Sequence, residues 1–300
     1  MRLRGVHLLL TYQCTYECDH CFVWGSPRQT GTMTLAAIRQ ILAQAAALGT
    51  QWIYFEGGEP FLYYATLARG VAEAARLGFR VGIVSNAYWA TSPEDAEEWL
   101  RPFAGQVREL SLSGDLYHSA TESAAQLAAA REAALRLGLP VDTMSVAQPE
   151  AYRGPAPVGQ LPPGQSGVMY RGRAAEALVG RAAHFPWHGF TTCPHEDLRE
   201  PGRLHVDPFG NLHLCQGLLV GNLFARPLAE ICAGYEPATH PVVGPLLRGG
   251  PAQLVREYDL PHADSYADAC HLCYEARRAL RPRFPEVLAP DQMYAGTATG

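Results

Sequence analysis

Residues 6–21 read V-H-L-L-L-T-Y-Q-C-T-Y-E-C-D-H-C. The apolar first half, Val6–Tyr12, predicts a buried strand. Three cysteines follow directly, Cys14, Cys18 and Cys21, in a Cys-x3-Cys-x2-Cys spacing. Three thiolates from one short loop suit an iron–sulfur cube in which one iron has no protein ligand, and such an iron can bind a small molecule.

A structural zinc site is the alternative for this loop. Structural zinc takes four ligands, commonly from paired Cys-x2-Cys knuckles. Here the loop supplies three cysteines after a strand, and no fourth cysteine stands nearby in the sequence. The spacing therefore favours an iron–sulfur cluster.

The composition limits the possible functions. The 300-residue chain is 48% hydrophobic with a net charge of −5, which suits a buried core and does not favour nucleic acid or an anionic membrane as partner. All 24 basic residues are arginine, which excludes a lysine Schiff base and a Walker-A lysine. The apolar run Val6–Leu10 is too short for a signal peptide or a membrane helix. Eight cysteines without an export signal predict metal ligands in a cytoplasmic protein.

Short apolar runs alternate with helical patterns in the first part of the chain. Strands are predicted at Val6–Tyr12, Trp52–Phe55, Phe79–Val84, Val107–Leu112 and Val141–Val146, with a sixth at Gly167–Ala175. Helices are predicted at Leu35–Leu48, Tyr64–Leu77, Ala124–Leu137 and from a capping Ser92. Repeated units of this kind require parallel strands, so we predict an α/β fold, a partial (β/α)6 TIM-like barrel. The chemistry of such barrels lies at the carboxyl ends of the strands.

A second unit is predicted after a break rich in proline and glycine between Pro149 and Gly167. Leu204–Asp207 and Asn211–Leu214 flank Pro208-Phe209-Gly210 and predict a hairpin. Helices are expected at Leu228–Tyr235 and Ala267–Leu280. We therefore expect a barrel domain over 1–175, a small α+β iron–sulfur module over 176–293 and a disordered tail over 294–300.

The cysteine motif resembles that of the radical S-adenosylmethionine (radical SAM) superfamily, and two more segments strengthen the resemblance. Gly57-Gly58-Glu59-Pro60 follows the second predicted strand, as the GGE segment of that family does. Ser85-Asn86 ends the third strand, where members often carry a polar pair near the ribose. His20 departs from the pattern, because many members have an aromatic residue there that packs near adenine. The resemblance covers about the first 175 residues.

The resemblance implies a set of cofactors and partners. The open iron of a [4Fe-4S] cluster would chelate the amino and carboxylate groups of S-adenosylmethionine, with the backbone of Gly57–Glu59 close to the ammonium. Reduced flavodoxin or ferredoxin would supply the electron that cleaves the cofactor to a 5′-deoxyadenosyl radical, which abstracts a substrate hydrogen. Arg171 or Arg173 would pair with the cofactor carboxylate, and a solvated surface arginine is the alternative.

Four more cysteines lie in the predicted second unit: Cys193, Cys215, Cys270 and Cys273. On spacing alone they could hold a structural zinc ion. Their arrangement resembles the auxiliary-cluster module called twitch, or the larger SPASM domain, and the G-N-L of Gly221–Leu223 fits those modules. The resemblance implies a second, auxiliary [4Fe-4S] cluster with four cysteine ligands and no open iron.

Cys232 lies outside both groups of cysteines. Its neighbours Leu228, Ile231 and Tyr235 recur at helical spacing, which is typical of a buried core face. The sharper hypothesis is a hydrogen-atom donor, as in epimerases of the superfamily. In that case Cys232→Ala would abolish product formation while S-adenosylmethionine is still cleaved.

Asp115 and His118 follow the fourth predicted strand. Polar groups at the carboxyl end of a barrel strand can position substrate or take a proton. Capping of the next helix and packing of the loop are the alternative.

The number of cysteines resembles that of twitch enzymes acting on sugar-like substrates. Our first hypothesis is therefore oxidation or epimerisation of a sugar-like, aminocyclitol-like or other natural-product metabolite. One alternative is maturation of a ribosomally synthesised peptide by crosslinking or epimerisation. Only 13 residues precede Cys14, so a leader-binding partner would be a separate protein. A non-catalytic metal-bound scaffold is the other alternative.

Overall fold

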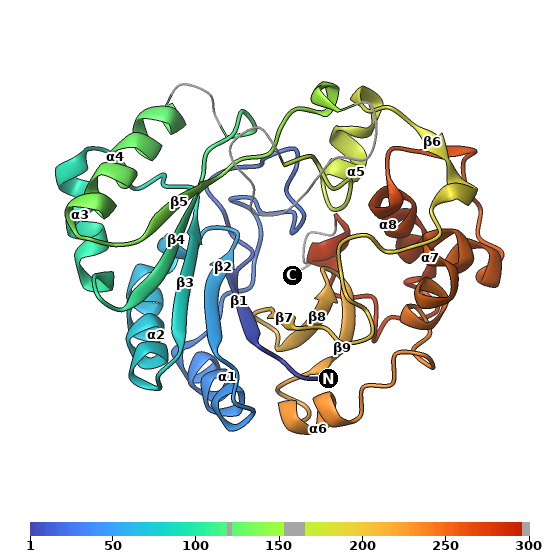
Figure 1. Ribbon diagram of the computed structural model, residues 1–300, viewed down its shortest axis with the longest axis horizontal. Helices are drawn as coiled ribbons and strands as arrows, with labels where there is room; N and C mark the ends of the chain where they lie inside the picture. The colour runs from blue at the N-terminus through green and yellow to red at the C-terminus, as the bar shows by residue number, and fades with distance from the viewer. Residues whose placement is uncertain (119–121, 153–165, 296–300) are drawn as a thin grey trace.

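The structure is a computed structural model that describes residues 1–118, 122–152 and 166–295. Its centre is an eight-stranded sheet in the order β5-β4-β3-β2-β1-β7-β8-β9 (Figure 1). The strands are β1 (Gly5–Thr11), β2 (Trp52–Gly57), β3 (Arg80–Ser85), β4 (Val107–Ser113), β5 (Val141–Met144), β7 (Arg203–Val206), β8 (Asn211–Cys215) and β9 (Leu218–Asn222). The short strands β6 (Phe185–Pro186) and β10 (Ser265–Tyr266) pair separately.

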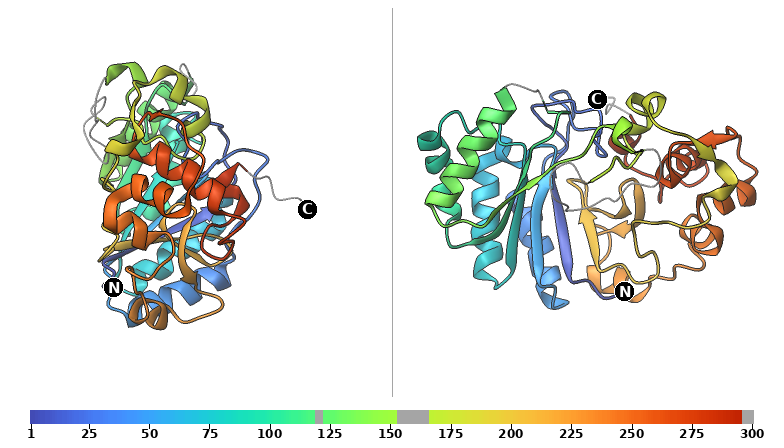
Figure 2. Two further views of the ribbon diagram at one scale, coloured as in Figure 1. Left: turned by 90° about the vertical axis from the view of Figure 1, so that its right-hand side faces the viewer. Right: turned by 45° about the horizontal axis from the view of Figure 1, so that its top comes forward.

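Helices lie on both sides of this sheet. The elements are α1 (Leu35–Ala47), α2 (Tyr64–Arg76), α3 (Pro93–Leu100), α4 (Glu122–Arg136), α5 (Ala174–Ala177), α6 (Leu228–Ala233), α7 (Val243–Tyr258) and α8 (Ala269–Leu280). Helices α1–α4 lie along one side, and α7 and α8 pack together on the other (Figures 1 and 2). Ser92 caps α3 as predicted, because its side chain accepts a hydrogen bond from the Asp95 amide.

The parallel α/β fold is confirmed, but the sixth predicted strand is wrong. Strands β1–β5 are parallel, and each is hydrogen-bonded to the next. The sixth parallel strand is β7, which pairs with the edge of β1 opposite to β2. Gly167–Ala175 forms no strand: a single bridge joins Ser166 to Val146, and Gly172 has a φ of 61°. A left-handed residue of this kind does not continue a strand.

The second half differs from expectation in two further places. Helix α7 was not expected, because its Gly249, Gly250 and Pro251 interrupt the helical pattern and kink the helix. Tyr294 was expected in a disordered tail, yet it is buried and its hydroxyl donates to the Gly217 carbonyl over 2.7 Å. Residues 296–300 and most of the predicted 149–167 loop lie outside the described residues.

The central strands have a helix-facing side and an inner side. Gly70 of α2 contacts the ring of Phe55, so Phe55 faces the helices. Tyr54 and Glu56 alternate with Phe55 and therefore face the inner side. Within the described ranges, no helix has the length and apolar character needed to span a membrane.

Candidate active site

The cysteine loop follows the carboxyl end of β1, as predicted. The Cys14 sulfur accepts hydrogen bonds from the Tyr16 amide (3.4 Å) and from Asn86 Nδ2 (3.5 Å). The Cys21 sulfur accepts one from the Gly25 amide (3.2 Å). Donors aimed at sulfur stabilise a thiolate more than a thiol, so this loop fits the ligand set of an iron–sulfur cluster.

Arg173 holds this loop from the side of α5. Its guanidinium donates to the carbonyls of Cys18 (2.7 Å) and Gly25 (2.8 Å), and its amide donates to the Cys21 carbonyl (2.9 Å). The neighbouring Gly172 lies so close that an added Cβ would be 2.5 Å from the Phe22 Cα. Arg173 therefore positions the cysteine loop, a role that the sequence did not indicate.

The glycine pair after β2 brings two backbones together. The Gly58 amide donates to the Thr11 carbonyl (2.6 Å), and the Glu59 amide donates to the Gln13 carbonyl (2.9 Å). A Cβ on Gly58 would lie 2.1 Å from the Gln13 oxygen, and Gly57 has a φ of 137°. Both positions need glycine, because the GGE segment packs directly on the residues that lead into Cys14.

Glu59 joins the ends of β2 and β3. Its carboxylate is fully buried and accepts hydrogen bonds from Ser85 Oγ (2.9 Å), the Asn86 amide (2.7 Å) and the Phe61 amide (3.0 Å). Burial raises the pKa of Glu59 to about 7, although these hydrogen bonds act in the opposite direction. Pro60 begins the short 3-10 helix that Glu59 caps. The predicted cofactor residues 57–60 and 85–86 thus meet beside Cys14.

Asp115 and His118 form a second polar group next to the cysteine loop. Asp115 Oδ1 lies 2.8 Å from His118 Nδ1, and Oδ2 lies 3.6 Å from His20 Nε2. The ring of His20 stacks on Tyr117 with centroids 4.5 Å apart. Burial lowers the pKa of His20 to about 4. Asp115 therefore orients two imidazoles, one of which belongs to the Cys-x2-Cys segment itself.

The other four cysteines line one small cavity together with two arginines. Cys215 ends β8, Cys270 and Cys273 lie on α8, and Cys193 lies in the segment before β7. Burial raises the pKa of Cys270 and raises that of Cys273 to about 12. Four thiols around one space can ligate either a cubane cluster or a zinc ion.

Arg171 lies at this second group, which corrects its predicted place at the cofactor carboxylate. Its Nη1 donates to the Cys215 sulfur over 2.9 Å and lies 3.6 Å from Glu196. The turn at Gly172 sends Arg171 to the second group while Arg173 reaches the first. Among the described residues, Arg171 Nε has no hydrogen-bond partner.

Arg277 also borders the second group and was missed in the sequence. It is almost fully buried, and its Nη1 donates to the Gln216 carbonyl over 2.8 Å. Its position four residues after Cys273 on α8 places both on one helix face, which is the signal that could have found it. Two buried guanidinium groups suit a group of net negative charge, as a thiolate-ligated cluster is.

Cys232 lies away from both cysteine groups. It is buried on α6, and its carbonyl accepts a hydrogen bond from the Met1 amine over 2.8 Å. Met1 precedes the amino end of β1, whereas the cysteine loop follows the carboxyl end, so the length of that strand, roughly 20 Å, separates them. This position favours the core interpretation of Cys232, and its hydrogen-donor role stays a prediction.

The part of the chain that carries the cysteine loop matches a known protein family. Residues 8–145 match the family model of the radical SAM superfamily. A curated relative, "Putative peptide biosynthesis protein YydG" of Bacillus subtilis (strain 168), is 31% identical over 118 residues, which are 39% of this chain and 37% of the relative. The match thus spans little more than a third of that protein.

Two solved structures resemble the chain weakly. SuiB of Streptococcus suis, bound to precursor peptide SuiA, is 11% identical with a TM-score of 0.45, covering 89% of this chain and 75% of SuiB. The radical S-adenosylmethionine methyltransferase TsrM of Kitasatospora setae, with cobalamin and a [4Fe-4S] cluster bound, is 15% identical with a TM-score of 0.37, covering 48% and 31%. Residues 8–145 of this chain thus match the domain of the radical SAM superfamily, whose members use a [4Fe-4S] cluster and S-adenosylmethionine.

Proposed function

We propose that this radical SAM enzyme abstracts a hydrogen atom from a peptide and so acts in peptide maturation. The curated relative that shares 31% identity over 118 residues is described as a peptide biosynthesis protein. This relative favours the peptide alternative over the sugar-like metabolite that the number of cysteines first indicated. The family match likewise disfavours a non-catalytic scaffold.

The observation that carries the radical step is the contact between the cysteine loop and the GGE segment. When bound, a [4Fe-4S] cluster with an open iron supplies the electron that cleaves S-adenosylmethionine. Gly57 and Gly58 keep the two backbones in contact, and Glu59 fixes Asn86, whose Nδ2 donates to the Cys14 sulfur. Residues of three strands thus hold one thiolate in place.

A pocket on the side of the second cysteine group offers room for a substrate side chain. It is partly open, has a volume of about 290 Å³, and includes Tyr152, Tyr170, Phe185 and Phe190 in its walls. This volume lies at the lower end of the range for small-molecule pockets, about 300–1000 Å³. Its aromatic walls suit apolar side chains of a peptide, and Asp268, whose pKa burial raises to about 6, offers a polar contact.

We further propose that residues 176–293 form an auxiliary module in which Cys193, Cys215, Cys270 and Cys273 ligate a second [4Fe-4S] cluster. The two buried arginines beside these thiols support a cluster of net negative charge. Reduced flavodoxin or ferredoxin is proposed as the electron donor.

Deuterium transfer tests the proposal directly. The reconstituted enzyme is incubated anaerobically with dithionite, S-adenosylmethionine and deuterated candidate peptides. We expect 5′-deoxyadenosine one mass unit heavier, and no 5′-deoxyadenosine from Cys18→Ala. Label transferred from deuterated aminocyclitols or sugars, but not from the peptides, would refute the peptide substrate.

A further inference from the structure

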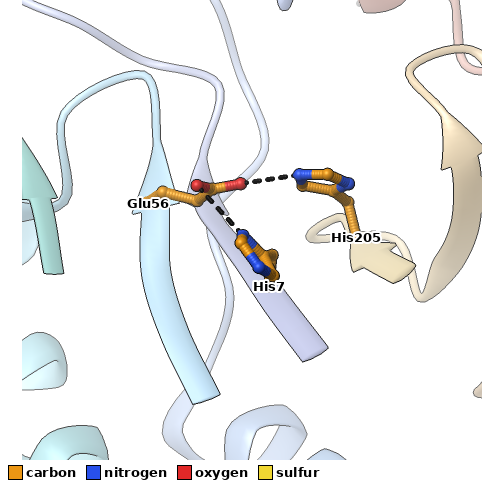
Figure 3. A group of neighbouring side chains, drawn as sticks. All are labelled: His7, Glu56 and His205. Carbon is orange, nitrogen blue, oxygen red and sulfur yellow. Dashed lines mark ion pairs between the residues drawn. The ribbon is translucent and has the colours of Figure 1, made fainter. Parts of the chain in front are cut away.

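Three polar side chains from three neighbouring strands meet on the inner side of the sheet. They are His7 of β1, Glu56 of β2 and His205 of β7 (Figure 3). Glu56 Oε2 lies 3.3 Å from His7 Nδ1, and Glu56 Oε1 lies 3.0 Å from His205 Nε2. This group contains none of the cysteines and none of the motifs of the radical SAM domain.

The register of the strands brings these side chains together. His7 is directly opposite His205 in the parallel β1–β7 pair, so the two rings lie side by side with centroids 4.8 Å apart. His7 is also opposite Tyr54 of β2, on whose ring it stacks at 4.5 Å. Glu56 follows Tyr54 by two residues and therefore faces the same side. The backbone of the sheet thus fixes all three side chains.

The group leaves buried polar atoms unsatisfied. Within the described part of the chain, His7 Nδ1, Glu56 Oε1, His205 Nδ1 and the neighbouring Gln216 Oε1 are buried without a hydrogen-bond partner. The side chain of His205 is 8% exposed, and those of His7 and Glu56 are 14% exposed. Buried polar atoms without partners are rare and often mark the place of an ion.

His205 Nε2 has two polar neighbours, Glu56 Oε1 at 3.0 Å and the Gln216 amide at 3.4 Å. A cation between the ring nitrogen and the carboxylate would satisfy both.

We propose that His7, Glu56 and His205 bind a divalent transition-metal ion such as Zn²⁺. The three ligand atoms lie within 4.8 Å of one another. Tetrahedral zinc with bonds near 2.0–2.1 Å has ligand atoms about 3.3 Å apart. Glu56 lies 3.3 Å from one imidazole and 3.0 Å from the other, each through a different carboxylate oxygen. Two imidazoles and a carboxylate are a common ligand set for zinc and its neighbours in the periodic table.

The surroundings suit such an ion. His7 lines a partly open pocket together with Trp52 and Tyr54, so one side of the group lies close to solvent. Gln216 offers an amide oxygen as a further ligand, because rotation of the amide exchanges its oxygen and nitrogen.

Zinc uptake by the cluster-loaded enzyme tests the proposal. The protein is incubated with Zn²⁺, passed over a chelating resin and analysed by mass spectrometry for metals. We expect about one zinc per chain in the wild type and about tenfold less in Glu56→Gln and His205→Gln, the usual effect of losing a ligand or its support. His240→Gln is the matched control. His240 is a partly buried histidine that lies outside the group, and its Nε2 contacts the Leu219 carbonyl.

X-ray absorption of the wild-type zinc provides a readout that needs no variant. Nitrogen and oxygen neighbours near 2.0–2.2 Å support the site. Sulfur neighbours near 2.3 Å would instead place the ion among the cysteines and overturn the proposal. The absence of bound zinc in the wild type, or its full retention in Glu56→Gln and His205→Gln, would overturn it as well.

Discussion

Replacing Gly58 by alanine tests whether the GGE segment is required for packing against the cysteine loop. The added Cβ would lie 2.1 Å from the Gln13 oxygen, 2.5 Å from the Gln13 carbonyl carbon and 2.8 Å from the Tyr12 oxygen. All three atoms belong to the backbone, so no side-chain rotation relieves the clash. The Gln13 carbonyl is also held by the Glu59 amide over 2.9 Å.

The size of the effect follows from the displacement. An ordinary carbon–oxygen contact is about 3.3 Å, so Gln13 and the alanine must separate by about 1 Å. Overpacking of a close contact costs about 1–3 kcal/mol and more where the neighbours are rigid, and we expect about 3 kcal/mol here. Because Cys14 follows Gln13, the same displacement moves a thiolate ligand away from its two hydrogen-bond donors.

The assay combines stability with chemistry. Chemical denaturation measures the free energy of unfolding, and 5′-deoxyadenosine release with dithionite measures cofactor cleavage. We expect Gly58→Ala to lose both stability and cleavage. Gly180→Ala is the control, because a Cβ there meets no atom within 4 Å. Wild-type cleavage and stability in Gly58→Ala would refute the reasoning.

Three further variants probe other parts of the molecule. Cys232→Ala should cost about 1 kcal/mol of stability and leave product per 5′-deoxyadenosine unchanged, measured by liquid chromatography; loss of product alone would support the hydrogen-donor role. Arg171→Gln removes the hydrogen bond to Cys215 and should lower the iron bound per chain, whereas the exposed Arg278→Gln should not. Burial raises the pKa of Glu59 from 4.5 to about 7, so its contribution to stability is full below pH 4.5 and lost as the pH rises through 7. Relative to Glu59→Gln, the wild type should lose about 3 kcal/mol of unfolding free energy between pH 4.5 and 8. The same difference in unfolding free energy between the two proteins at both pH values would contradict this.

Local sequence patterns correctly predicted those elements that are formed by residues adjacent in the chain. The Ser92 cap and the turn at Pro208–Gly210 are examples, because the residues that make them are adjacent in the chain. The Cys14–Cys21 loop was predictable for the same reason. Burial alone misled the prediction at Gly167–Ala175: Val168 and Tyr170 are buried in a small separate cluster with Leu178 and do not pair in the sheet.

Long-range contacts account for the rest of the candidate site. Nothing near Arg171 in the sequence indicates that it reaches Cys215, 44 positions away. The group of His7, Glu56 and His205 depends on β7 pairing with β1, and the chain between those strands is almost 200 residues long. Periodicity reports which residues are buried, but not which strands become neighbours.

The pairing of β7 with β1 has a consequence for dissecting this protein. Residues 5–8 of β1 are hydrogen-bonded on one side to β2 and on the other to residues 203–206. A fragment ending near residue 175 would leave β1, which reads G-V-H-L-L-L-T, as an unprotected edge strand. Exposed apolar edges of this kind pair with other chains. The barrel region expressed by itself should therefore aggregate. The break between the two predicted units in the sequence does not separate two parts that fold independently.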